Sequence, residues 1–427
     1  MDTFGKAPFS HIVRSLTCPC VSMMMFDVDG IQNEKPKRNA HASTPSSWLR
    51  TMNASRSKGF KYIEQLTWLR GFAAFLVIVS HSLRATEVKY SPDDEAASSL
   101  LMSLFDLGSF GVVLFFVLSG CTLYISNASK VGGRRNIMAF YLKRFFRIWP
   151  AYIVALAAYM LFREFFSNHY ITPLGHWVEQ QFLASYSAAD ALSYAMLTFN
   201  LTGPEGLFNN AFWSLPVEFQ YYLIFPLLVL SLRSGIIGPL AIGALLYLVP
   251  RTGLIDIDDD TVFLLAFSFC GGVAVGYLYT NFDVSIRGRT GFALLSILLL
   301  FISLITNGFI PLPDIPLLAE RWNWYGGIAI ISVYLVLITR FDLHNRMEAF
   351  LSHYGNISYS TYLYHNIFVG LSVLFMVNMG IHDGSLKLFL TFSFTLLATY
   401  VVASLSYRYI ERPFIGIGRS MVKRISE

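Results

Sequence analysis

Residues 66–84 read LTWLRGFAAFLVIVSHSLR, an apolar stretch with very few ionisable side chains. A helix of about 20 apolar residues is long enough to cross the roughly 30 Å hydrocarbon core of a membrane. Arg70 and His81 lie eleven positions apart in this stretch, which is about 16 Å along a helix axis. An ionisable group in a membrane helix costs free energy unless it faces a partner or a cavity. The stretch therefore predicts a membrane helix that carries two candidate functional residues.

Similar apolar stretches recur along the 427 residues of the chain. Apolar and aromatic residues make up 54% of the sequence and charged residues only 14%, against about 25% in soluble domains. This composition excludes a disordered chain and argues against a soluble globular protein. The sequence predicts an all-α integral membrane protein with about ten transmembrane helices. The ten candidate spans are 66–84, 107–126, 150–166, 213–232, 235–250, 261–280, 291–308, 324–339, 358–378 and 386–407.

The placement of Lys and Arg predicts the orientation of these helices, because cytoplasmic loops are rich in both. With a cytoplasmic N-terminus, the predicted inner segments carry 23 Lys and Arg residues and the outer segments carry three. The outer loops are acidic instead, as at 92–95 and 256–260. We therefore expect a multi-pass protein of the plasma (inner) membrane with both termini in the cytoplasm.

Three segments of different composition predict the domain organisation. Residues 1–60 are polar and predict a disordered cytoplasmic tail. Residues 61–415 are expected to form the ten-helix membrane domain, and residues 416–427 a basic cytoplasmic tail. The four cysteines show no metal-ligand spacing, so we expect no metal site, and no pattern predicts a nucleic-acid partner.

Glu218 is a further ionisable residue expected inside the membrane, near the start of the span 213–232. It lies about one and a half helical turns below the predicted outer surface, at a depth similar to that of His81. A carboxylate at this depth could hold the Nδ1 proton of His81 and make Nε2 a general base. Two alternatives stay open: Arg70 could snorkel to the headgroups while His81 only packs, or His81 and Glu218 could form a proton relay in a transporter.

The basic segment from Arg134 to Pro150 mixes Arg and Lys with Phe, Tyr and Trp. This mixture predicts an interfacial helix at the cytoplasmic headgroups, which precedes the third span and ends at Pro150. Arg144 and Arg147 share one face of that helix. Because Arg binds phosphate oxygens with bidentate geometry, the two could clamp a phosphorylated ligand that arrives from the cytosol. The alternative is an ordinary positive-inside anchor.

The span 358–378 opens with the hydroxyl-rich sequence SYSTYLYH, from Ser358 to His365. Polar groups inside a membrane bundle need partners there. Tyr359 and His365 are therefore candidate pore-lining residues. We expect His365 to line a pore or to be structural, rather than to be the base.

Together these residues resemble the acyltransferase 3 family of membrane-bound enzymes. Arg70 and His81 are similar to that family's Arg-x10-His pattern in the first helix, and RFFR at 144–147 is similar to its Arg-x-x-Arg motif. Further similarity lies in FGVVLFFVLSG at 110–120, WSLPVE at 213–218, the segment from Ser358 to His365, and ERP at 411–413. The resemblance covers about residues 60–415, with the motifs in family order.

The resemblance implies a function, because members of this family O-acylate glycans and other hydroxyl-bearing molecules. It implies acyl-CoA, most often acetyl-CoA, as a donor substrate, with no permanently bound cofactor, and a carbohydrate or other hydroxyl as acceptor. The CoA phosphates would bind Arg144, Arg147 and Arg70, while His81, oriented by Glu218, would act as a base or carry the acyl group as acyl-imidazole.

Two questions stay open from the sequence. The high position of His81 favours an acceptor at the outer face of the membrane. The competing class is a secondary transporter or exporter of a small polar solute, although the first five spans show no convincing repeat in the last five.

Overall fold

The computed structural model describes eight stretches of the chain, all within one compact unit, Trp48–Glu427. The predicted tail 1–60 and the acidic loops at 92–95 and 256–260 fall outside or largely outside these stretches. Side chains are described throughout except in residues 95–106 and at residue 426. The described stretches are 63–86, 95–128, 133–170, 174–203, 206–250, 263–306, 321–381 and 383–426.

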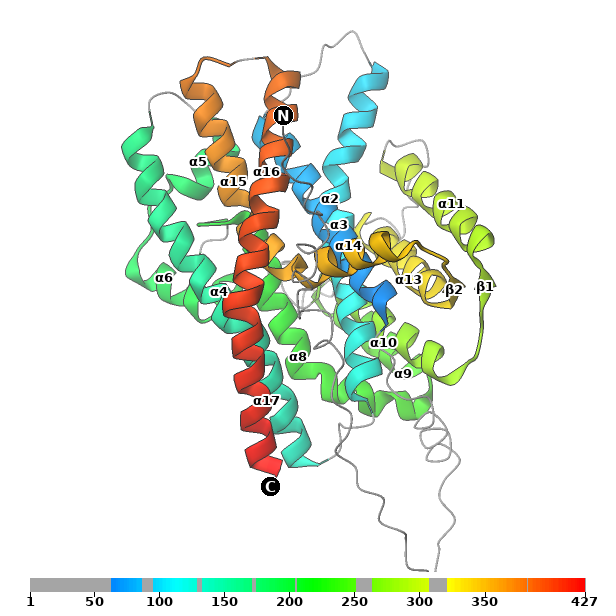
Figure 1. The fold of residues 1–427 in the computed structure, drawn as a ribbon. Helices are drawn as coiled ribbons and strands as arrows, with labels where there is room; N and C mark the ends of the chain where they lie inside the picture. The colour runs from blue at the N-terminus through cyan, green and yellow to red at the C-terminus, as the bar shows by residue number, and fades with distance from the viewer. Residues whose placement is uncertain are drawn as a thin grey trace, which may run out of the picture. The chain divides into compact units, whose positions relative to one another are not determined.

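Helices dominate the described residues (Figure 1). Two short strands, β1 (Ile286–Arg287) and β2 (Thr339–Arg340), pair in parallel. Short turns of other helix types are η1 (Asn210–Trp213), η2 (Leu232–Ser234) and the π-helical turn η4 (Tyr407–Glu411). The α-helices are α2 (Glu64–Thr86), α3 (Glu95–Asn127), α4 (Arg134–His169), α5 (His176–Phe182), α6 (Ala188–Ala195), α7 (Phe199–Thr202), α8 (Ser214–Ser231), α9 (Ile237–Leu248), α10 (Ala266–Asn281), α11 (Gly288–Thr306), α13 (Arg321–Ile338), α14 (Asn345–Asn356), α15 (Ser358–Asn378), α16 (Gly384–Ser406) and α17 (Arg412–Ser426).

The predicted all-α membrane fold is confirmed. Eight segments of the described chain are helical, long and apolar enough to cross a membrane. Each of the ten predicted spans coincides with a helix, but two of these helices are shorter than the other eight. They are α9, with 12 residues, and α10, with 16 residues.

Helix α3 packs closely against α2 on one side and α10 on another. Glycines permit this approach: a Cβ atom on Gly272 of α10 would lie only 2.1 Å from the carbonyl oxygen of Val117 in α3. In the same way, a Cβ atom on Gly120 of α3 would lie 2.2 Å from the carbonyl oxygen of Phe269. Small residues let membrane helices pack backbone to backbone.

Helix α4 corrects the prediction of a separate interfacial helix. The basic segment is the first part of one 36-residue helix, which passes through Pro150. Proline removes one backbone N–H, but membrane helices tolerate it where neighbouring groups bond the backbone nearby. In this helix the Tyr359 hydroxyl of α15 also donates a hydrogen bond to the carbonyl oxygen of Ile148 (2.9 Å), which ties the first half of α4 to the bundle. The start of α4 therefore belongs to the bundle and not to a detached surface helix.

Helix α14 lies across the long helices in Figure 1, as an interfacial helix does. Its side chains Met347 and Phe350 are more than half exposed, and Trp68 of α2 donates its indole N–H to Ser352 (2.9 Å). Close approach of α14 to α2 requires Gly355, where a Cβ atom would lie 1.9 Å from the carbonyl oxygen of Thr67. This contact holds α14 against the part of α2 that carries Arg70.

The last described residues, within the predicted basic tail, form a helix. Helix α17 continues α16 through the π-helical turn η4, and it packs against α4 (Figure 1). At this contact Gly418 meets the side chain of Phe146. The predicted tail 416–427 is thus mostly helical, and its cytoplasmic location stays a prediction.

Candidate active site

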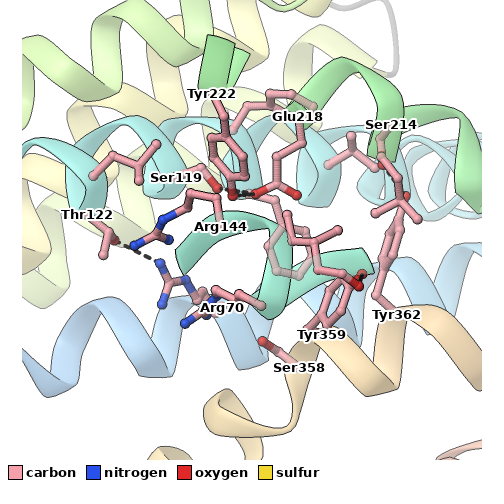
Figure 2. Close-up of a pocket in the computed structure, with 17 residues that line it drawn as sticks. Arg70, Ser119, Thr122, Arg144, Ser214, Glu218, Tyr222, Ser358, Tyr359 and Tyr362 are labelled. Carbon is pink, nitrogen blue, oxygen red and sulfur yellow. Dashed lines mark hydrogen bonds between the residues drawn. The ribbon is translucent and has the colours of Figure 1, made fainter. Parts of the chain in front are cut away.

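A pocket of about 80 Å³ lies between α2, α3, α4, α8 and α15. Three arginines line it: Arg70 from α2, with Arg144 and Arg147 from α4. Figure 2 shows Arg70 and Arg144 together with the polar side chains around them. Segments that are far apart in the sequence therefore meet at one positively charged hollow, as the prediction of a shared phosphate site requires.

Two of these arginines are oriented by their neighbours. Arg70 donates from Nη2 to the hydroxyl of Thr122 (3.0 Å). The Arg144 guanidinium lies 5.9 Å from the ring centre of Phe140 and 5.8 Å from that of Tyr222. Its Nε atom is buried and has no hydrogen-bond partner among the described residues. An unpaired buried N–H of a cation is costly, and an anionic ligand in the pocket would satisfy it.

Glu218 belongs to this arginine pocket. Its carboxylate accepts hydrogen bonds from the hydroxyl groups of Tyr222 (2.5 Å) and Ser119 (3.0 Å), as Figure 2 shows. Within the described chain, this carboxylate forms no ion pair with an arginine at an N···O distance of 4.0 Å or less. The pocket thus holds three guanidinium groups and one carboxylate, and it keeps an excess of positive charge.

The predicted contact between Glu218 and His81 is wrong, because the two side chains have different partners. Matching depth fixes how far along its helix a residue lies, but not which way its side chain points. Tyr221, about one helical turn after Glu218, is packed between Phe116 of α3 and Phe269 of α10. This packing sets the rotation of α8 and turns Glu218 toward Ser119.

His81 instead forms a pair with His365 of α15. His81 Nδ1 lies 2.8 Å from His365 Nε2 and 2.9 Å from the Asn366 side-chain oxygen. His365 Nδ1 lies 2.9 Å from the carbonyl oxygen of Tyr362, which can only accept a hydrogen bond. A neutral His365 therefore carries its proton on Nδ1 and offers Nε2 as an acceptor. His81 must then donate from Nδ1, and its proton-free nitrogen is Nε2.

No hydrogen bond joins the His81 Nε2 atom to another residue of the described chain. The ring is half-buried, and the indole of Trp177 from α5 lies beside it, with ring centres 5.4 Å apart. His81 thus presents an unprotonated nitrogen in a site that is partly open. This is the state that a general base or a nucleophile requires.

A cluster of side-chain amides holds Asn366, whose oxygen is the second acceptor for His81 Nδ1. The Asn366 side-chain nitrogen lies near three oxygens, those of Gln181 (3.1 Å), Asn209 (2.7 Å) and Asn210 (2.9 Å). These contacts identify the nitrogen end of the Asn366 amide and leave its oxygen for His81. The sequence analysis missed this cluster. Its one sequence signal is the polar pair His365-Asn366 in the middle of an apolar span.

Tyr362 links the arginine pocket to the histidine pair. Its ring lines the pocket, and its hydroxyl bonds to the carbonyl oxygen of Ala211 (2.5 Å) and the hydroxyl of Ser214 (2.8 Å). Its own carbonyl oxygen accepts the hydrogen bond from His365. A single residue of α15 thus contacts both the pocket and the imidazole pair.

The predicted site residues therefore fall into two groups. Arg70, Arg144, Arg147, Glu218 and Tyr359 meet at the arginine pocket. The two histidines form the other group, which Tyr362 also contacts. His365 is fully buried and does not line the arginine pocket.

Comparison with known proteins assigns the chain to a family. A family model described as an acyltransferase domain matches residues 63–408, which include both groups. The chain belongs to the acyltransferase 3 family. This family membership agrees with the resemblance seen in the sequence motifs and with the multi-span membrane fold.

Individual members of the acyltransferase 3 family are distant relatives. The chain is 23% identical over 397 residues to the O-acetyltransferase OatA of Staphylococcus aureus, covering 83% of this chain and 57% of OatA. It is 30% identical over 171 residues to the acyltransferase MdmB of Streptomyces mycarofaciens, covering 39% of this chain and 38% of MdmB. The chain spans less than three fifths of the length of the O-acetyltransferases that it matches. No solved structure matches it significantly.

Proposed function

We propose that this protein is a membrane O-acyltransferase that moves an acyl group from acyl-CoA to a hydroxyl group. The observation that carries the proposal is the pairing of His81 Nδ1 with His365 Nε2 and the Asn366 side-chain oxygen, which makes Nε2 the proton-free nitrogen of a neutral His81. Arg70, on the same helix, lies in a hollow with two further arginines. Membership of the acyltransferase 3 family supports an acyltransferase over a transporter of small solutes.

The arginine pocket is the proposed site for the phosphates of acyl-CoA. Arg144 and Arg147 come from consecutive turns of α4, and Arg70 faces them from α2. Guanidinium groups bind phosphate oxygens through two parallel N–H donors, and the pocket retains positive charge beyond that of Glu218. Bound phosphate would also give the unpaired Arg144 Nε an acceptor.

The thioester end of the donor then has to reach His81, about 16 Å further along α2. Tyr362 connects the two groups of residues, because its side chain lines the pocket and its carbonyl oxygen accepts the hydrogen bond from His365. The two ends of an extended acyl-CoA molecule therefore correspond to the two groups of residues: phosphates at the arginines and the reacting carbonyl at the imidazole. With Arg70 near the cytoplasmic side, as the distribution of Lys and Arg predicts, this spacing favours donor entry from the cytosol and transfer near the outer face.

In the proposed reaction, His81 Nε2 takes the proton from the acceptor hydroxyl as its oxygen attacks the thioester carbonyl carbon. The carbon–sulfur bond breaks, and the CoA sulfur leaves with the proton that His81 returns. The products are an O-acyl ester and CoA with a free thiol. We propose acetyl as the acyl group, because OatA, a relative, is named an O-acetyltransferase. A glycan or lipid-linked sugar is the proposed acceptor, as the resemblance to the acyltransferase 3 family implies.

The test uses membranes that contain the full chain and acetyl-CoA labelled in the acetyl group. We expect transfer or hydrolysis of the label, with His81→Ala lowering the rate by at least about 100-fold, as expected for loss of a general base. The control is His169→Ala, which changes an exposed histidine at the end of α4. Turnover that persists in His81→Ala at an unchanged protein level would exclude His81 as the base.

The acceptor is identified by mass analysis of surface glycans from cells with and without the protein. We expect an acetyl increment on a glycan that disappears with His81→Ala. An increment found only on cytosolic precursors would contradict transfer at the outer face.

A further inference from the structure

We propose that His365 is a positioning residue that fixes the tautomer and ring orientation of His81. This inference rests on the proposed function, in which His81 is the base. His365 takes the part that a carboxylate usually plays beside a catalytic histidine, and it does so without a charge. The structure thereby assigns a function to a buried histidine that the arginine pocket does not use.

The hydrogen bonds of His365 run in one direction only. The Tyr362 carbonyl oxygen has no proton to give, so it forces His365 to donate from Nδ1. His365 Nε2 is then left with a lone pair, which faces His81 Nδ1 at 2.8 Å. A neutral His81 satisfies this lone pair only in the Nδ1–H form, which leaves Nε2 free to accept a proton.

His365 is well placed to hold this geometry, because its side chain is fully buried and has a hydrogen-bond partner at each ring nitrogen. The side chain is 0% exposed. It belongs to α15, which is the most buried of the eight candidate membrane spans in the described chain. Both of its ring nitrogens are bonded, and its ring plane is inclined by only 18° to that of His81. A ring flip would break the bonds to Tyr362 and to His81 together.

Asn366 reinforces the same tautomer from a second direction. Its side-chain oxygen accepts from His81 Nδ1 at 2.9 Å, and its nitrogen is held by the amide cluster. The one Nδ1 proton of His81 therefore faces two acceptors. Both acceptors remain when Nε2 gains a proton, so they stabilise the imidazolium that forms during transfer.

The test compares two substitutions that each keep one half of the His365 ring chemistry. In His365→Gln the side-chain oxygen can replace Nε2 as the acceptor for His81. In His365→Asn the shorter amide reaches only the place of Nδ1, so it keeps a donor to Tyr362 and loses the acceptor for His81. We expect kcat within about tenfold of the wild type for Gln and about 10- to 100-fold lower for Asn.

The KM for acetyl-CoA should stay unchanged in both variants, since the arginine pocket keeps its lining residues. Both proteins are also compared with the wild type for thermal stability in detergent. A merely structural role for His365 predicts equal loss in the two variants, and that result, or no loss in either, would overturn the inference.

A second readout does not depend on turnover. In full-length protein labelled with ¹⁵N in histidine, the His81 signals are assigned by their loss in His81→Ala. We expect a protonated Nδ1 and an unprotonated Nε2 in the wild type, and a mixture of tautomers in His365→Asn. A wild-type Nε2–H tautomer would refute the positioning role, whereas failure of the proposed function would appear separately, as unchanged turnover in His81→Ala.

Discussion

Arg144 shows at the scale of one residue why the pocket is suited to an anion. Its guanidinium lies near two aromatic rings, and its Nε is buried without a protein partner in the described chain. Rings stabilise a cation, but they supply no lone pair in the plane of the guanidinium. The donor is therefore left for a ligand.

Substitution of this residue should weaken donor binding. We expect Arg144→Gln to raise the dissociation constant of CoA by about tenfold or more, because a charge-assisted hydrogen bond is worth roughly 1.5–3 kcal/mol. Calorimetry on purified protein measures this dissociation constant. Arg135→Gln is the matched control, since it removes an exposed arginine from the same helix. Equal weakening by both changes would indicate general charge attraction and not a specific site.

Residue identity was more predictable from the sequence than residue pairing. Arg70, Arg144 and Arg147 do meet, because all three are expected near the same predicted side of the membrane, which already brings them to one depth. Glu218 and His81 do not, because the rotation of α8 depends on ring packing around Tyr221 that no residue count reveals. Asn209 and Asn210 lie before the span of α8, and only the fold brings them to Asn366.

At the scale of elements, the contact between α3 and α10 should be sensitive to added volume. We expect Gly272→Ala to destabilise the protein by about 1–3 kcal/mol, since the new methyl group meets the backbone of Val117, which cannot move aside as a side chain does. Gly327→Ala is the control, because a Cβ atom there meets nothing within 4 Å. Thermal unfolding in detergent compares the two variants, and equal melting temperatures would contradict the packing account.

Helix α4 illustrates what hydropathy misses at this scale. The basic stretch before Pro150 and the apolar stretch after it have different compositions, so the sequence indicates two elements. In the fold they are one helix, and the contacts of α17 and α15 with its first half stabilise the continuation. Tertiary packing therefore overrides both the charge pattern and the proline.

For the whole molecule, the distribution of Lys and Arg predicts that both termini lie in the cytoplasm. We expect green fluorescent protein fused after residue 427 to be fluorescent, and alkaline phosphatase at the same position to be inactive, because that enzyme folds only outside the cytoplasm. Fusions after residue 251, in a predicted outer loop, serve as the control with the opposite result. An active C-terminal phosphatase would reverse the assignment of the two faces.

The central claim is that one acyl-CoA molecule spans the arginine pocket and the histidine pair. The most direct measurement is a structure of the full chain with a thioether analogue of acetyl-CoA that cannot transfer its acetyl group. The account predicts phosphate oxygens bonded to Arg144 and Arg147, and the carbonyl carbon within about 3.5 Å of the site where a hydroxyl would meet His81 Nε2. An analogue whose carbonyl end lies away from His81, with the phosphates bound elsewhere, would contradict it.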